Sequence, residues 1–216
     1  HVLIEKTKGV NRSGWTLTGG VTFYESPSVL TYIEITETEA EDALNIIRSS
    51  YVISDSEFSA TDSDAFDGDF SQGVILQSNF HDIGGDAIDV SGADLSISST
   101  MISEVGDKAV SAGENSFVQI DNTQIENIGI GIASKDSSTV SINDSIISKA
   151  NHMALAAFVK KPEYGPATIK ANKLTVSDTN LISIVQTDST VILNGVTQDT
   201  TEINVNDLYA QGILGN

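Results

Sequence analysis

The sequence of 216 residues contains no cysteine, only 3 prolines and 6% aromatic residues. Without cysteine, disulfide bonds and thiolate metal sites are excluded. No run of 18 apolar residues is present, so the sequence predicts no membrane-spanning helix. Basic residues are scarce, since 11 Lys and Arg stand against 30 Asp and Glu and give a formal net charge of −19. This charge disfavours nucleic acid and anionic membranes as partners and suits calcium or other hard cations and neutral glycans.

The chain shows no shift of composition that would mark a domain boundary. We therefore expect one domain over residues 1–216, with atypical end coils at about 1–28 and 200–216. It opens with "HVLIEKTKG", which has no initiator methionine and no signal-type apolar stretch. We interpret the chain as a segment of a larger protein.

Two sequence markers recur at a nearly constant interval. The segments "EDALN", "SDAFD", "GDAID" and "GDKAV" place Asp42, Asp64, Asp86 and Asp107 at steps of 22, 22 and 21 residues. Pairs of apolar residues separated by one position also recur, and they begin at Val74, Leu95, Val118, Val140, Ile169 and Val191. One step in that series is 29 residues long and contains the extra segment "KKPEYGP", which indicates a loop insertion in one repeat.

The repeat predicts an all-β fold. Each unit holds segments of 3 to 5 residues that alternate apolar with polar positions, and Gly, Asn, Asp or Ser separates them. This pattern is typical of a single-stranded right-handed parallel β-helix, a solenoid with about 22 residues per coil and nine or ten coils. Stacked coils place like residues in columns. One predicted inward column is Leu44, Phe66, Ile88, Ala109, Ile132 and Leu155, and another is Ile46, Gly68, Val90, Ser111, Ser134 and Ala157.

On the segments "GGVTFYES", "EDALNIIRS", "SDAFDGDFSQG" and "GGDAIDVSG", the chain resembles the right-handed parallel β-helix superfamily, the pectate-lyase-like group, over about residues 20 to 200. The sequences of these segments are also similar to those of repeat domains in bacterial exported or surface proteins. This resemblance implies an extracellular or cell-surface location. "SDAF", "GDAI" and "GDKA" also resemble polygalacturonase-type glycosidases. Gly85 departs from that family, which carries a second acid there, and neither a His-Gly nor an Arg-x-Lys motif is present.

The repeated aspartates have three interpretations. In the first, each turn aspartate accepts a hydrogen bond from a backbone N–H group two residues on and simply shapes a corner of the coil. In the second, Asp67, Asp69 and Asp89 form an acidic stripe whose oxygen ligands hold calcium, the one candidate cofactor.

The third interpretation is catalysis. Stacked coils bring carboxyl groups to the separations that glycosidases use, so Asp64, Asp86 and Asp107 are candidate acid and base residues. Lys108 follows Asp107 where earlier coils carry alanine, and Lys135 lies one coil further on. Both lysines are candidate catalytic partners, and ordinary surface ion pairs are the alternative.

The inserted loop supplies candidate ligand-binding residues. Lys160 and Lys161 add two cations, and the ring of Tyr164 can stack on a sugar. The sequence thus indicates an extracellular or cell-surface scaffold or recognition module that presents an acidic face to a polysaccharide or to an adjacent domain of the same protein. A polysaccharide lyase or glycoside hydrolase acting on that face is the alternative, and the sequence leaves open whether the protein is an enzyme.

Overall fold

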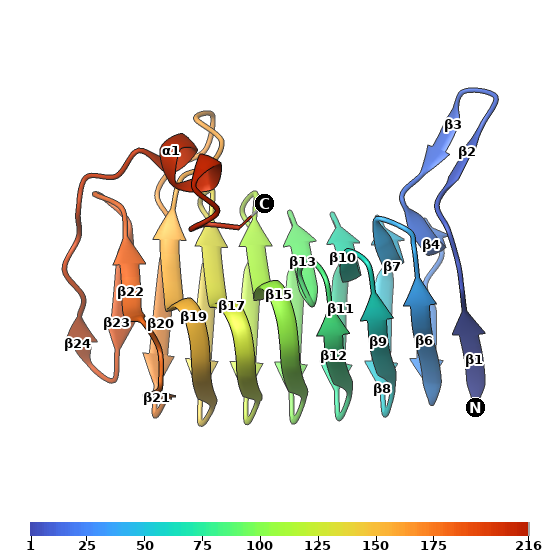
Figure 1. The fold of residues 1–216 in the computed structure, drawn as a ribbon, viewed down its shortest axis with the longest axis horizontal. Coiled ribbons are helices and arrows are strands. Elements are labelled where there is room, and N and C mark those ends of the chain that lie inside the picture. Colours follow the sequence, from blue (N-terminus) through green and yellow to red (C-terminus); the bar gives the residue numbers. More distant parts are fainter. Residues whose placement is uncertain (216) are drawn as a thin grey trace.

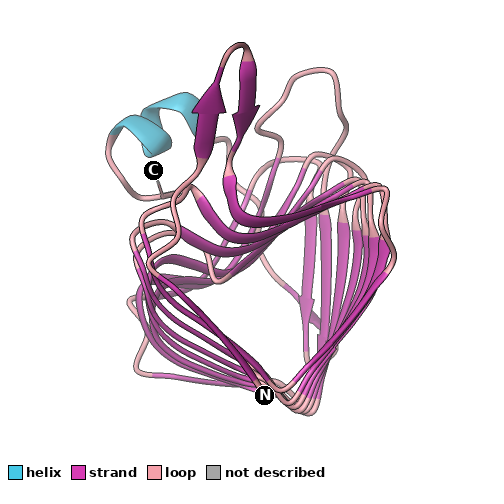
Figure 2. Cartoon of the chain, turned by 90° about the vertical axis from the view of Figure 1, so that its right-hand side faces the viewer, coloured by secondary structure: helices cyan, strands magenta, loops and turns pink. Residues whose placement is uncertain are grey.

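The computed structural model describes residues 1–215 and forms a right-handed parallel β-solenoid (Figure 1). It has about eight turns with about 22 residues per turn, so the predicted fold and period are confirmed. The predicted nine or ten coils are too many, because the first and last segments of the described chain do not complete regular coils. Viewed along the axis, the coils stack into a prism with three sheet faces (Figure 2).

Face A and face C meet at a corner that several strands turn without interruption. Face A consists of β4 (Gly19–Tyr24), β7 (Asp42–Ile47), β10 (Asp64–Asp69), β13 (Ile88–Ser91), the second halves of β15 (Met101–Gly113), β17 (Gln124–Lys135) and β19 (Ile146–Phe158), and β22 (Leu181–Val185). Face C consists of β1 (Val2–Glu5), β6 (Ile33–Thr38), β9 (Glu57–Thr61), β12 (Asn79–Ile83), the first halves of β15, β17 and β19, and β21 (Thr175–Ser177).

Face B is a separate sheet of nine strands. Its members are β5 (Ser28–Thr31), β8 (Ser50–Ser54), β11 (Gln72–Leu76), β14 (Asp94–Ser98), β16 (Phe117–Asp121), β18 (Thr139–Asn143), β20 (Thr168–Asn172), β23 (Thr190–Leu193) and β24 (Val196–Thr197). All pairings are parallel except that of β23 with β24. Between β19 and β20 the chain runs through residues 159–167, so the predicted insertion is a loop at the corner of faces A and B.

The inward columns are close to the prediction but shifted by one residue in one coil. Leu44, Phe66 and Ile88 are register partners, and Ile88 pairs with Val110. The predicted members Ala109 and Ser111 are therefore wrong, and Val110 and Ala112 occupy those columns. The aspartate series steps by 21 residues here while the strand register advances by 22. On face B, Ile75 is the inward partner of Ile97, and Val74 pairs with outward Ser96.

Serine ladders hold two of the corners. The N–H of Ser56 donates to Oγ of Ser78 on the next coil at 3.3 Å, and that hydroxyl donates to the carbonyl of Leu76 at 2.9 Å. At the corner of faces A and B, the N–H of Ser116 donates to Oγ of Ser138 at 3.0 Å. Each hydroxyl satisfies a backbone group that the turn removes from the sheet ladder, which explains the recurring serines.

The two ends of the described chain depart from the coil pattern. An antiparallel hairpin of β2 (Val10–Arg12) and β3 (Trp15–Leu17) interrupts the first coil. After β24 the chain returns across face A and forms α1 (Val205–Ala210), which Asn204 caps (Figure 1). This C-terminal segment covers outward apolar residues of face A, among them Ile130 and Met153. No helix among residues 1–215 is long and apolar enough to cross a membrane.

Candidate functional site

The repeated aspartates form a hydrogen-bonded ladder at the corner of faces C and A. Asp64 Oδ1 accepts the backbone N–H of Asp86 at 2.7 Å, and Asp86 Oδ1 accepts the backbone N–H of Lys108 at 2.9 Å. The carboxylates thus bond to the following coil and not to a residue two positions on, which corrects the expected turn geometry. Lys108, and not Asp107, continues the column of Asp42, Asp64 and Asp86, because the ladder advances by 22 residues.

A cleft of about 330 Å³ opens over this ladder. It contains all five residues that the sequence indicated as catalytic candidates. Its lining is Glu41, Asp62, Ser63, Asp64, Gly84, Gly85, Asp86, Asp89, Asp107, Lys108, Lys135 and Lys160. The coils between Asp64 and Lys160 therefore bring acidic and basic side chains into one concave surface.

Glycine makes room for the first carboxylate. A Cβ at Gly85 would collide with Oδ1 of Asp64, and a Cβ at Gly84 would collide with the carbonyl of Asp62. A second acid at position 85 is therefore sterically incompatible with this arrangement. The departure from the polygalacturonase pattern has a physical cause in the position of the Asp64 side chain.

Three carboxyl groups lie close together in the cleft. Oxygen atoms of Asp64, Asp86 and Asp89 all lie within 4.8 Å of one another. Lys108 and Lys135 lie close enough to offset part of the negative charge of this group. Lys108 Nζ lies 3.3 Å from Asp86 Oδ1 and 2.7 Å from Asp107 Oδ2, and Lys135 Nζ lies 3.9 Å from Asp89 Oδ1.

Burial raises the carboxyl pKa values in this cluster. Burial first, and then repulsion from Asp86, raises the pKa of Asp64 to about 8. Burial raises the pKa of Asp86 to about 6, against the opposing attraction of Lys108. At neutral pH the cluster therefore holds a protonated Asp64 beside a largely ionised Asp86.

The three lysines of the cleft differ in how burial and nearby charges shift their pKa values. Burial alone would lower the pKa of Lys108, but Asp86 and Asp107 outweigh it and raise the value. For Lys135, burial alone would also lower the pKa, but the opposing charges, chiefly that of Asp89, raise it. Lys160 differs, because partial burial and then the nearby charges of Lys135 and Lys108 lower its pKa.

The ring of Tyr209 lies beneath this third lysine. Lys160 Nζ sits 4.5 Å from the centroid of that ring, which also packs edge-on against Phe158 at 6.1 Å. Sequence reasoning missed Tyr209, because it lies in α1, outside the repeats and about 50 residues from Lys160. It also missed Asp136, whose Oδ1 accepts the backbone N–H groups of Lys160 and Lys161 at 2.6 and 2.8 Å and holds the start of the loop.

The remaining ligand-binding candidates, Lys161 and Tyr164, and the calcium candidates Asp67 and Asp69 do not line the cleft. Lys161 forms an ion pair with Glu114, and Tyr164 belongs to the loop beyond it. Asp67 and Asp69 lie further along β10, where Asn45 Nδ2 donates to Asp67 Oδ2 at 2.6 Å. Among residues 1–215, the carboxylates gathered at metal-ligand distances are those of Asp64, Asp86 and Asp89, so only Asp89 of the predicted calcium set belongs to that group.

Solved structures with the same fold support the solenoid assignment. Tailspike protein 2 from Escherichia coli O157:H7 bacteriophage CAB120 matches with a TM-score of 0.53 and 10% identity, over 90% of this chain and 32% of that one. The A-module of mannuronan C-5 epimerase AlgE4 from Azotobacter vinelandii matches with a TM-score of 0.50 and 9% identity, over 86% of this chain and 63% of that one. The chain thus spans less than two thirds of either protein. No curated protein sequence matches it.

Family membership follows from the repeats themselves. The family model for the right handed beta helix region matches residues 42–197, the part of the chain in which the strands keep their register from coil to coil. This stretch includes the aspartate ladder and both corners held by serine. The chain belongs to the right handed beta helix family.

Proposed function

We propose that the protein is a carbohydrate-recognition module of an exported or cell-surface protein, and that its cleft binds an acidic glycan. The observation that carries the proposal is the position of Lys160. Within residues 1–215 no carboxylate lies at ion-pair distance from its ammonium group, whereas Lys108 and Lys135 are both paired. A cation at the rim of a cleft that has only a ring as partner favours an anionic group on the ligand.

The rest of the cleft suits a polyhydroxylated chain. Asp64 and Asp89 line the cleft and are only partly buried, which suits contact with ligand hydroxyl groups, although Asp89 Oδ1 itself is enclosed. The epimerase module that shares this fold acts, by its name, on mannuronan, which supports a glycan as the ligand class. An adjacent domain of the same protein is the other partner consistent with an acidic surface of this kind.

Replacing the lysine at the rim tests the proposal. We expect Lys160→Met to weaken binding of an acidic polysaccharide by about tenfold or more, because one charge-assisted contact of about 1.5 kcal/mol is lost. Affinity electrophoresis in gels containing polymannuronate or polygalacturonate measures the loss. Lys161→Met is the matched control, since Lys161 lies beside Lys160 in the chain but pairs with Glu114. Equal effects of the two variants, or no binding by the wild type, would contradict the proposal.

Cleavage of the bound polysaccharide is a second candidate function, which one observation favours. The pKa of Asp64 is raised to about 8 and that of Asp86 to about 6, so one carboxyl holds a proton near neutral pH while its neighbour is mostly ionised. Separated pKa values of this kind suit a general acid and a general base. Lys108 and Lys135 would then stabilise the ionised carboxylates, and would not themselves remove a proton.

Asp64→Asn separates cleavage from binding. If the wild type depolymerises a glycan, we expect the variant to lose about 100-fold or more of the rate, since general acid catalysis contributes that much. The wild-type rate should also fall as the pH rises through about 8, where Asp64 loses its proton. Reducing-end release and absorbance of unsaturated products measure hydrolysis and elimination. Asp121→Asn, at an exposed position of face B, is the control, and a rate unaffected by Asp64→Asn would exclude this carboxyl as the acid.

A further inference from the structure

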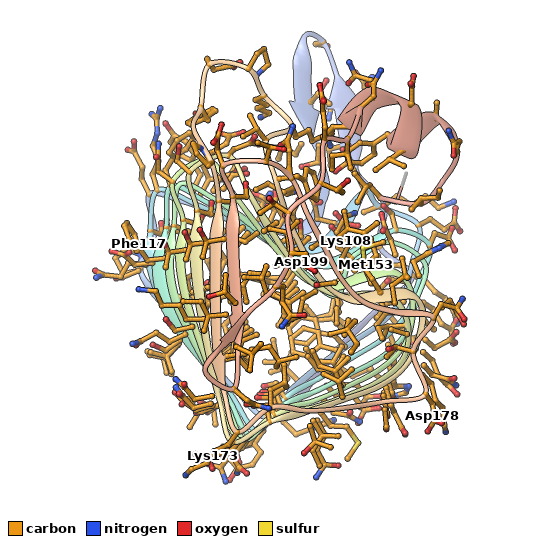
Figure 3. All side chains as sticks on the ribbon, turned by 90° about the vertical axis from the view of Figure 1, so that its left-hand side faces the viewer. Lys108, Phe117, Met153, Lys173, Asp178 and Asp199 are labelled. Atoms are coloured by element: carbon orange, nitrogen blue, oxygen red, sulfur yellow. The ribbon has the colours of Figure 1, made fainter. Side chains whose placement is uncertain are left out.

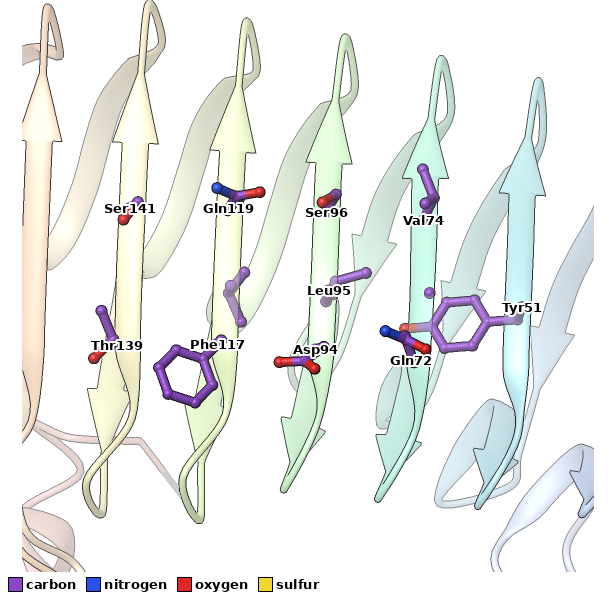
Figure 4. Close-up of a pocket in the computed structure, with 12 residues that line it drawn as sticks. Tyr51, Gln72, Val74, Asp94, Leu95, Ser96, Phe117, Gln119, Thr139 and Ser141 are labelled. Carbon is purple, nitrogen blue, oxygen red and sulfur yellow. The ribbon is translucent and has the colours of Figure 1, made fainter.

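Face B carries a second concave surface, unrelated to the cleft. A shallow groove of about 570 Å³ crosses the outer side of β8, β11, β14, β16 and β18 (Figure 4). One row of its side chains is made by the register partners Gln72, Asp94, Phe117 and Thr139. A second row, two residues along each strand, holds Ser96 and Gln119. Because neighbouring strands lie about 4.8 Å apart, the first row spans roughly 14 Å.

An aromatic ring lies open in the middle of the first row. Phe117 is 59% exposed, although it belongs to a regular central strand. Figure 4 shows its ring face-on in a view onto the groove, so one face of the ring is turned to solvent. A ring that lies flat on a sheet, between polar neighbours, offers a platform for the C–H groups of a sugar ring.

The polar side chains around the ring are available for a ligand. No hydrogen bond within residues 1–215 uses the side chain of Gln72, Asp94 or Gln119. Elsewhere on the same face, polar side chains bond to one another along the solenoid. Asn143 Nδ2 donates to Asp121 Oδ1 at 3.0 Å, and Asn172 Nδ2 donates to Asn143 Oδ1 at 3.3 Å.

The charge of the groove defines its ligand. Among the described residues, Asp94 is the one carboxylate in the lining, and no lysine or arginine lines the groove. An anionic glycan would therefore meet only repulsion, in a chain whose net charge is −19. Of the apolar side chains in the lining, only Phe117 is exposed and Val74 is half-buried in the part of the chain that the structure describes, which is less apolar contact than a protein partner needs. We infer that face B binds a neutral oligosaccharide, which stacks on Phe117 and bonds through its hydroxyl groups to Asp94 and Gln119.

This surface is independent of the cleft. Figure 3 places Phe117 on one side of the solenoid and Lys108 near the face that the C-terminal segment covers. The two sites also differ in their charged groups, since within residues 1–215 the cleft combines lysines with carboxylates, whereas the groove has one carboxylate and no lysine. Failure of one proposal therefore does not decide the other.

Affinity electrophoresis with neutral polysaccharides tests the inference. The probes are laminarin, hydroxyethyl cellulose, glucomannan and dextran, with polymannuronate as the acidic comparison. We expect the wild type to be retarded by at least one neutral probe, and Phe117→Ala to reduce that affinity by at least about tenfold, as loss of a stacking contact predicts. Binding of polymannuronate should be unchanged in Phe117→Ala.

A matched variant and three contrary outcomes make the test decisive. Ile146→Ala removes another exposed apolar side chain, 44% exposed and on a different face, and should leave neutral binding as in the wild type. No retardation by any neutral probe, or equal retardation of wild type and Phe117→Ala, would overturn the inference. Self-association of the wild type that Phe117→Ala abolishes, measured by sedimentation, would assign the groove to a second copy of the chain and would also overturn it.

Discussion

Lys108→Met should destabilise the protein by about 3 to 5 kcal/mol, because removing one member of a buried ion pair takes away the largest attraction that compensates the buried carboxylate of Asp86. The side chain of Lys108 is only 4% exposed and contacts both Asp86 and Asp107. Chemical denaturation at pH 8 measures the change in the free energy of unfolding. The melting temperature should fall by roughly 6 to 20 °C, as expected for a chain of this size.

The pH dependence of this loss of stability distinguishes the effect of the missing charge from the effect of altered packing. Without Lys108, the pKa of Asp86 rises further, and the variant recovers part of its stability as acid supplies the missing proton. We therefore expect a smaller difference at pH 5 than at pH 8. Lys173→Met is the control, since Lys173 pairs with Asp144 at 3.0 Å but is 77% exposed and should change stability by less than about 1 kcal/mol. Similar losses in the two variants would contradict a stabilising role for the buried charge of Lys108.

Asp67→Asn should stabilise the protein at pH 8 by at least about 2 kcal/mol and have almost no effect at pH 4. Burial first, and then the charge of Asp69, raises the pKa of Asp67 to about 9. The folded state must therefore take up a proton that the unfolded chain releases above its ordinary pKa of 3.8. The free energy of unfolding of the wild type thus falls as the pH rises from about 4 to about 9, and asparagine removes this dependence.

Thermal denaturation between pH 4 and pH 9 measures the effect. The amide of Asn at position 67 can still accept from Asn45 Nδ2, so the variant keeps the contact that the carboxylate makes at 2.6 Å. Asp121→Asn, at an exposed position, should leave the pH profile unchanged. A variant less stable than the wild type at pH 8 would contradict the prediction. If millimolar calcium stabilised the wild type and not Asp67→Asn, the carboxylate would instead serve as the calcium ligand expected from the sequence.

The candidate site was partly predictable. Asp64 and Asp86 could be placed together from the 22-residue period alone, because stacking brings equivalent positions to the distance between neighbouring strands. The role of Lys108 could not be read in the same way. The aspartate pattern steps by 21 residues at that point, so the sequence aligned Lys108 with alanine, whereas the strand register places it in the column of the aspartates.

Residue type alone did not predict where the candidate calcium ligands and the loop lysines lie in the structure. Asp67 and Asp69 have the chemistry of calcium ligands, but they lie further along the strand than the group formed by Asp64, Asp86 and Asp89. Lys160 and Lys161 are adjacent in the loop, yet only Lys160 lines the cleft. The direction of each side chain depends on how Asp136 holds the backbone of the loop, and no local pattern encodes that contact.

The sequence by itself determined the solenoid, its period, the inserted loop and most of the inward columns. These features repeat, and each coil packs against another of nearly the same sequence, so periodicity is sufficient to specify them. Tertiary structure alone decided which lysine continues the aspartate ladder and how the C-terminal segment meets the site. The first depends on a one-residue difference between sequence spacing and strand register. The second depends on the contact of Tyr209 with Lys160, which are far apart in the chain and belong to no common repeat.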